Sequence, residues 1–134
     1  MNRRNSGLRP DCFIGCRFKR IGGDESSTEG RAFAWIADGV TPGSNFELPA
    51  LGNLAFENLL PLPHSGSRTA VISNEDTSGG QLYVYAGDKR DTGTDIERAG
   101  LTDGVLYGIK ANFLNEVTSG QALSGTFQLA RPGD

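Results

Sequence analysis

The residues of this chain with the clearest capacity for chemistry are carboxylates beside apolar segments. Glu57 lies within the apolar segment 56–63, and Glu75 and Asp76 follow the apolar segment 68–74. Burying a carboxylate is costly unless it is paired or bound to a cation. Hard cations such as Ca²⁺ take about six to eight oxygen ligands from carboxylates, amides, carbonyls and water. Glu57, Glu75 and Asp76 are therefore candidate metal ligands, with calcium as the candidate ion.

A second interpretation of the acid pair is ordinary turn chemistry. The segment 74–80 reads Asn-Glu-Asp-Thr-Ser-Gly-Gly, and Asn, Asp, Ser and Gly are residues that tight turns favour. The spacing of an EF-hand loop is missing from the sequence, so a calcium site would have to be assembled from separate strands. Both interpretations of Glu75 and Asp76 remain open at this point.

Other catalytic and metal motifs are missing from the sequence. It contains no nucleophile elbow, no phosphate-binding P-loop and no dinucleotide fingerprint. Its two cysteines, Cys12 and Cys16, and its one histidine, His64, are too few for a zinc site, which needs about four ligands. We interpret the cysteines as thiols of a flexible arm and His64 as a loop residue. Catalytic residues are left unassigned.

Charge is unevenly distributed along the chain. The net charge is −3, yet residues 1–20 hold six Lys/Arg and one Asp, whereas the remainder holds seven Lys/Arg and 15 Asp/Glu. An acidic body argues against nucleic acid as a partner. No apolar run approaches the roughly 18 residues of a membrane span, and the basic head lacks the apolar core of a signal peptide. We interpret residues 1–28 as a basic, disordered leader and 29–134 as the folded domain.

Short apolar segments separated by glycine-rich turns predict an all-β fold. The chain has 19 glycines and six prolines and shows no long helical pattern. Prolines limit the segment 39–53 to short or edge pairing. The strands expected on either side of Gly79 and Gly80 form a hairpin. Strands are expected at 31–38, 68–74, 80–87, 104–112 and 124–130, and a short strand or a single turn is expected at 56–63.

Two local patterns allow finer predictions. Thr94 and Glu97 have the spacing of a capping box, and Gly100 stands where a C-terminal glycine is expected, which predicts a short helix near 94–100. In the strand at 80–87, Tyr83 and Tyr85 share one face. Such a pair can stack on a sugar ring or pack beneath another sheet, and packing is the more frequent outcome.

The order of three segments resembles secreted bacterial proteins related to the PhoX-type alkaline phosphatases. These segments are EGRAFAWIADG, FELPALGNLAFENLLPLP and TAVISNEDTSGGQLYVYAGDKRDTGTDIERAGLTDGVLYGIKAN, within about residues 29–130. The resemblance implies an antiparallel β-propeller phosphomonoesterase with calcium and iron, whose metals are held mainly by acidic side chains near the propeller axis. It also implies a secreted or periplasmic parent protein, although this chain has no signal peptide.

The resemblance also ranks the candidate ligands. Glu57 matches the Glu of a His-Glu strand opening, but Phe56 replaces the His. Glu75 and Asp76 match an acid-rich strand end. The resemblance therefore implies Glu57 as the first metal ligand and the acid pair as the next. The change at Phe56 weakens the transfer of catalysis more than the transfer of fold.

The chain has the length of one or two propeller blades, an incomplete ring. We expect a fragment of a metal-dependent, phosphatase-like β-propeller whose full-length parent hydrolyses phosphorylated small molecules, with little or no activity in the fragment alone. Uncovered sheet edges would permit edge-strand self-association. The alternative is a non-enzymatic calcium- or polysaccharide-binding β module of a bacterial surface or secreted protein.

Overall fold

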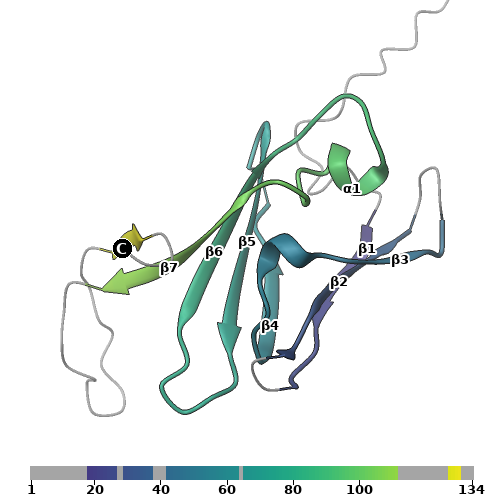
Figure 1. Cartoon of the computed structure of the whole chain (residues 1–134). Helices are drawn as coiled ribbons and strands as arrows, with labels where there is room; N and C mark the ends of the chain where they lie inside the picture. Colours follow the sequence, from purple (N-terminus) through teal and green to yellow (C-terminus); the bar gives the residue numbers. More distant parts are fainter. Residues whose placement is uncertain (1–17, 27–28, 38–41, 64, 112–126, 131–134) are drawn as a thin grey trace, which may run out of the picture.

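The computed structural model describes residues 18–26, 29–37, 42–63, 65–111 and 127–130 (Figure 1). These residues form two antiparallel sheets, which confirms the all-β prediction. Within each sheet the strands are hydrogen-bonded in sequence order, so both sheets are simple meanders. The three-stranded sheet contains β1 (Phe18–Gly23), β2 (Ala32–Ile36) and β3 (Asn45–Glu47). The five-stranded sheet contains β4 (Phe56–Pro61), β5 (Arg68–Glu75), β6 (Leu82–Asp88), β7 (Val105–Ala111) and β8 (Phe127–Ala130).

Each predicted strand is present, and the proline-rich segment behaves as expected. It contributes only β3, three residues long and at the edge of its sheet, followed by the 3₁₀ turn η3 (Pro49–Leu51). The predicted hairpin is β5–β6, with Arg68 opposite Asp88 at one end and Asn74 opposite Leu82 at the other.

Strand β1 lies in the segment that the sequence analysis assigned to a leader, and that interpretation fails for residues 18–23. This segment pairs with β2, Ile21 packs against the core, and β1 contacts β4 (Figure 1). Gly23 makes the close approach possible, because a Cβ there would overlap the Phe56 side chain. The basic composition of this segment gave no indication of β1, because its partners β2 and β4 lie later in the chain. Cys12, Cys16 and His64 lie outside the described residues.

The core lies between the inner faces of the two sheets. Side chains from both sheets and from the segments that close the core are almost completely buried. On β2 the buried residues alternate with half-buried Phe33 and Trp35, as a strand with one face in the core requires. The buried core consists of Ala32, Ala34, Ile36, Leu48, Leu51, Phe56, Val71, Tyr85, Ile96, Ala99 and Leu101.

The predicted helix is α1 (Asp95–Arg98), and its capping box is formed. The Thr94 side chain accepts a hydrogen bond from the Glu97 backbone N–H, and the Glu97 carboxylate accepts one from the Thr94 N–H. Gly100 follows the helix with φ of 67°, the left-handed conformation that favours glycine. Among the described residues, no helix has the length and apolar character needed to cross a membrane.

Tyr85 ties the loop after α1 to the five-stranded sheet. Its ring is fully buried, and its hydroxyl donates to the Gly100 carbonyl at 2.9 Å and accepts from the Gly104 N–H at 2.9 Å. Thr69, also buried, donates from its hydroxyl to the Ala99 carbonyl at 2.5 Å. A Cβ at Gly104 would overlap the Tyr85 ring. The predicted packing of the tyrosine face is therefore correct for Tyr85.

We expect Tyr85→Phe to lower the free energy of unfolding by about 2–3 kcal/mol, because it leaves the Gly104 N–H and the Gly100 carbonyl without their partner. Urea denaturation followed by circular dichroism measures the loss. Tyr83→Phe is the matched control, since the Tyr83 hydroxyl is only partly buried, and should cost less than about 1 kcal/mol. Equal losses in the two variants would contradict this role of Tyr85.

Candidate functional site

The three candidate carboxylates lie at one end of the five-stranded sheet: Glu57 on β4, Glu75 at the end of β5 and Asp76 directly after it. Phe56 pairs with Glu75, and Asn58 pairs with Asn74, so Glu57 is the extra residue of a β-bulge on β4. A bulge leaves its extra residue out of the ladder and redirects the side chain. Glu57 is exposed, whereas Phe56 beside it is 1% exposed and belongs to the core. The bulge explains how an acid can follow a core phenylalanine without being buried.

Glu75 is used by the β5–β6 hairpin. Its carboxylate accepts hydrogen bonds from the Gln81 backbone N–H at 3.0 Å and from the Tyr83 hydroxyl at 3.2 Å. Asp76 has an exposed side chain, and its backbone N–H donates to the Ala55 carbonyl at 2.8 Å. The turn interpretation therefore accounts for the hydrogen bonds observed at both residues.

The residues present do not by themselves fit a metal site. Within the described part of the chain, no group of three or more His, Cys, Asp or Glu side chains is placed to hold a metal ion. Glu57, Glu75 and Asp76 are all described, and the Glu75 carboxylate already binds two donors of the hairpin. Metal ligation by these acids stays a prediction, and it requires further ligands from outside this set.

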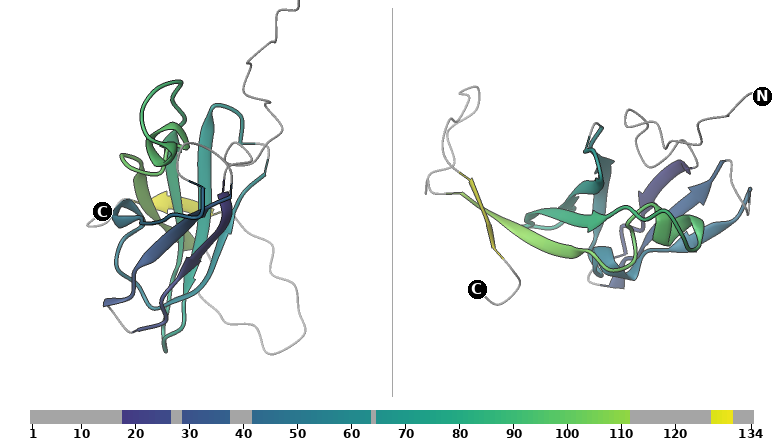
Figure 2. Two further views of the ribbon diagram at one scale, coloured as in Figure 1. Left: turned by 90° about the vertical axis from the view of Figure 1, so that its right-hand side faces the viewer. Right: turned by 90° about the horizontal axis from the view of Figure 1, so that it is seen from above.

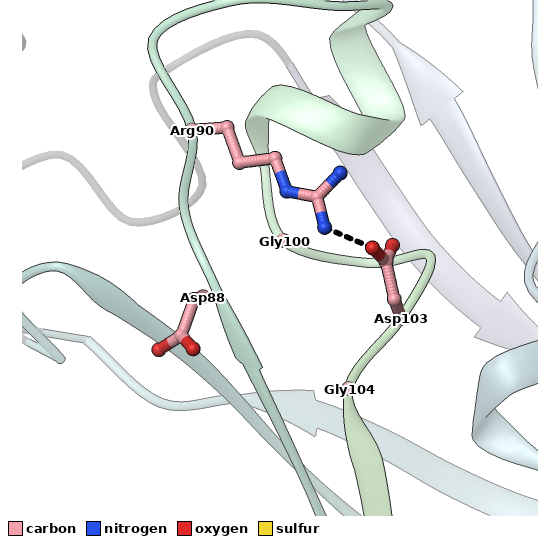
Figure 3. Close-up of a pocket in the computed structure, with 5 residues that line it drawn as sticks. All are labelled: Asp88, Arg90, Gly100, Asp103 and Gly104. Carbon is pink, nitrogen blue, oxygen red and sulfur yellow. Dashed lines mark hydrogen bonds and ion pairs between the residues drawn. The ribbon is translucent and has the colours of Figure 1, made fainter.

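A small pocket lies where β6 ends and β7 begins. It has a volume of about 50 Å³ and is lined by Asp88, Arg90, Gly100, Asp103 and Gly104 (Figure 3). Arg90 forms an ion pair with Asp103, whose pKa is lowered by the Thr102 hydroxyl and by the Arg90 guanidinium. This volume holds a few water molecules and is far below the roughly 300–1,000 Å³ of a typical ligand pocket. The pocket is too small for a phosphorylated substrate, and its ion pair serves to close the loop.

Charged residues at the end of β6 and directly after it, within 88–91, bind neighbouring segments of the chain. Asp88 pairs with Arg68 on the neighbouring strand at 3.2 Å, and both side chains are largely exposed. Lys89 donates from Nζ to the Gly66 carbonyl at 2.9 Å, and partial burial lowers its pKa. The charges of this turn therefore bind the start of β5 and the loop before it. Exposed pairs of this kind contribute little to stability.

The outer face of the three-stranded sheet carries an aromatic surface that the sequence analysis did not select as a site. The rings of Phe33 and Trp35 lie 6.3 Å apart, centroid to centroid, at an angle of 48°. The register places Arg20 and Asn45 on either side of Trp35, and Glu47 beside Phe33. We call these five side chains the aromatic platform. The alternation of Phe33 and Trp35 was a signal for it.

Polar and charged side chains surround Trp35 at the rim of the aromatic platform. The Arg20 guanidinium lies over the indole ring, 5.4 Å from its centroid, a cation–π arrangement. Gly22 lies beneath both groups, and a Cβ there would be in van der Waals contact with the indole and the guanidinium at 3.4 Å. Glu47 pairs with Arg31 at 3.3 Å. A half-buried indole edged by an amide, a guanidinium and a carboxylate can hold an amphipathic ring.

Comparison with known proteins identifies no family. No protein-family model, no curated protein and no solved structure matches the chain. The resemblance to the phosphatases therefore stays a prediction that depends on the order of the quoted segments. The geometry of the two sheets and of the acidic and aromatic side chains is the basis for the proposals below.

We expect the free energy of unfolding to fall as the pH rises above about 10. The pKa of Tyr83 is raised by burial and then by the Glu75 carboxylate, and the pKa of Tyr85 is raised by burial. Above the unfolded pKa the unfolded chain releases these protons first, so proton release favours unfolding.

Urea denaturation between about pH 9 and pH 11 measures this fall. Lys89, whose pKa is lowered, acts in the opposite direction, so the informative comparison is between the wild type and Tyr83→Phe/Tyr85→Phe. The double variant should lose less stability over this range. An identical decline in both proteins would show that these two phenols are not responsible.

Proposed function

We propose that this chain is a fragment of a metal-dependent, phosphatase-like β-propeller that has little or no phosphomonoesterase activity by itself. The observation that carries the proposal is the contact between β1 and β4, the first strands of two successive meanders. Figure 2 shows the two sheets from two further directions. Propeller blades are antiparallel meanders whose first strands surround a common axis. The two sheets would then be neighbouring blades, with β1 and β4 nearest the axis.

The position of Glu57 supports this proposal. It is exposed on β4, which is an edge strand of the five-stranded sheet and contacts β1. An acidic side chain on the innermost strand is where the resemblance implies a calcium or iron ligand. The remaining ligands would come from other blades of a secreted or periplasmic parent. In that parent the metal ions would neutralise the charge of a phosphorylated small molecule.

We expect the 134-residue chain to show no measurable hydrolysis of p-nitrophenyl phosphate with calcium and iron present, because its described acids do not gather into a metal site. Glu57→Gln should behave like the wild type in this assay and should leave the melting temperature unchanged, since Glu57 is exposed. Turnover by the wild type that Glu57→Gln abolishes would overturn the expected inactivity and show that the chain holds a complete site.

A second candidate function, polysaccharide binding by a non-enzymatic β module, is supported by the aromatic platform. Phe33 and Trp35 are only half-buried, so their rings are accessible on the outer face of the three-stranded sheet. Their rings could contact the apolar face of a sugar, while Arg20 and Asn45 bind its hydroxyl groups. The calcium-binding form of this alternative has less support, because the Glu75 carboxylate is already engaged.

Trp35 is the single tryptophan of the chain, so intrinsic fluorescence reports on the aromatic platform directly. If this platform binds polysaccharide, oligosaccharides titrated into the protein should change the Trp35 emission saturably. Asn45→Ala, which removes an exposed amide beside the ring, should weaken binding about tenfold without altering the fold. Ser78→Ala, in an exposed turn distant in register, is the control. Unchanged emission across a panel of neutral and acidic oligosaccharides would exclude this second function.

A further inference from the structure

The outer face of the five-stranded sheet, the face turned away from the core, is apolar. Along β5 the residues Thr69, Val71 and Ser73 are buried against the core, so the alternate residues of the strand form the outer face. The register extends that face across the sheet. It contains all four of the large hydrophobic side chains that are exposed among the described residues, namely Leu60 at 61%, Leu82 at 41%, Val105 at 37% and Leu129 at 55%.

Half-buried apolar residues join these four into one surface. Leu60, Ile72, Val84 and Tyr107 are successive cross-strand partners on β4 to β7, which makes a straight apolar row across the sheet. Ala70, Ala86 and Val105 form a parallel row on one side of it. On its other side Ile109 on β7 pairs with Leu129 on β8. Contiguous apolar surfaces of this extent mark interaction sites.

The dimensions of this surface suit a partner of the same size. Five strands about 4.8 Å apart, with about 3.4 Å per residue along the seven residues of β6, give a face of roughly 20 Å by 20 Å. Two copies that overlap over four of these strands would remove roughly 800–1,000 Å² of surface from water, which is the size of a weak, transient interface.

We propose that this face binds the same face of a second copy of the chain, in a two-fold symmetric, face-to-face dimer. The proposal goes beyond the proposed function, because in a longer propeller the next blade would occupy this face, whereas in the 134-residue chain a second copy does. Two-fold pairing through one self-complementary surface is the commonest arrangement of homodimers. It also differs from pairing through sheet edges, because it uses side chains and leaves the backbone groups of the edge strands free.

The cross-strand register makes the face self-complementary. A dyad running between β5 and β6, parallel to them, lays β5 of one copy over β6 of the other. Ile72 then lies over Val84 of the second copy, and the small side chain of Ala70 over Ala86. At the end of the face Arg68 meets Asp88 of the second copy, so the charges that pair within one chain also pair across the dimer. The face therefore brings no unpaired charge to the interface.

The test is the mass of the whole chain in solution, measured by light scattering and sedimentation from about 5 to 200 μM. The wild type should move from the mass of one 14.3 kDa chain to twice that mass as the concentration rises. Leu60→Lys/Val105→Lys places two charges in the face and should raise the dimer dissociation constant at least tenfold. Ser78→Lys/Thr92→Lys adds the same charge at exposed turn positions and should dimerise like the wild type.

Circular dichroism melting shows whether the double variant is folded. If Leu60→Lys/Val105→Lys does not fold, Leu82→Lys, a single change at a 41% exposed position of the same face, carries the test. A wild type that is monomeric at the highest concentration overturns the proposal. So does a folded face variant that dimerises like the wild type. Growth to open-ended oligomers also overturns it, because that is the behaviour expected of edge-strand pairing.

Discussion

The hydroxyl of Tyr85 is the constraint on which the packing between the sheet and the loop after α1 depends. A buried phenol needs hydrogen-bond partners, and here both come from the backbone, from Gly100 and Gly104. Those bonds hold the segment after the helix across the end of the core, where Leu101 is buried. Close backbone approach at Gly87 follows from the same geometry, since a Cβ there would overlap the Gly100 carbonyl.

The two faces of the five-stranded sheet have different environments. Its inner face packs on the three-stranded sheet, while its outer face carries the large exposed apolar side chains of the described chain. An antiparallel sheet with one face in the core normally has polar residues on the other. Here that alternation is broken by residues such as Leu60 and Val84. The same feature supports both the propeller fragment, in which another blade covers the face, and the dimer.

The acidic end of the sheet shows how secondary structure assigns different roles to similar side chains. Glu75 and Glu57 lie on paired strands, but the hairpin engages Glu75 through Gln81 and Tyr83, whereas the bulge exposes Glu57. An acid held by two hydrogen bonds of its own hairpin has a structural role. An acid displaced by a bulge is available to something outside the described fold. Glu57 is accordingly the residue on which the phosphatase-like proposal depends.

Local sequence determined β2, the strands from β5 to β8, the β5–β6 hairpin and the capping box at Thr94, because these depend on alternation, turn residues and contacts within a few positions. Only the tertiary structure decided that residues 18–23 form β1, that Glu75 binds its own hairpin, and that Trp35 stands at the surface beside Arg20. Each of these depends on which face of a strand meets the core and which distant segment lies beside it. Periodicity shows that a strand has two faces, and packing decides which one is buried.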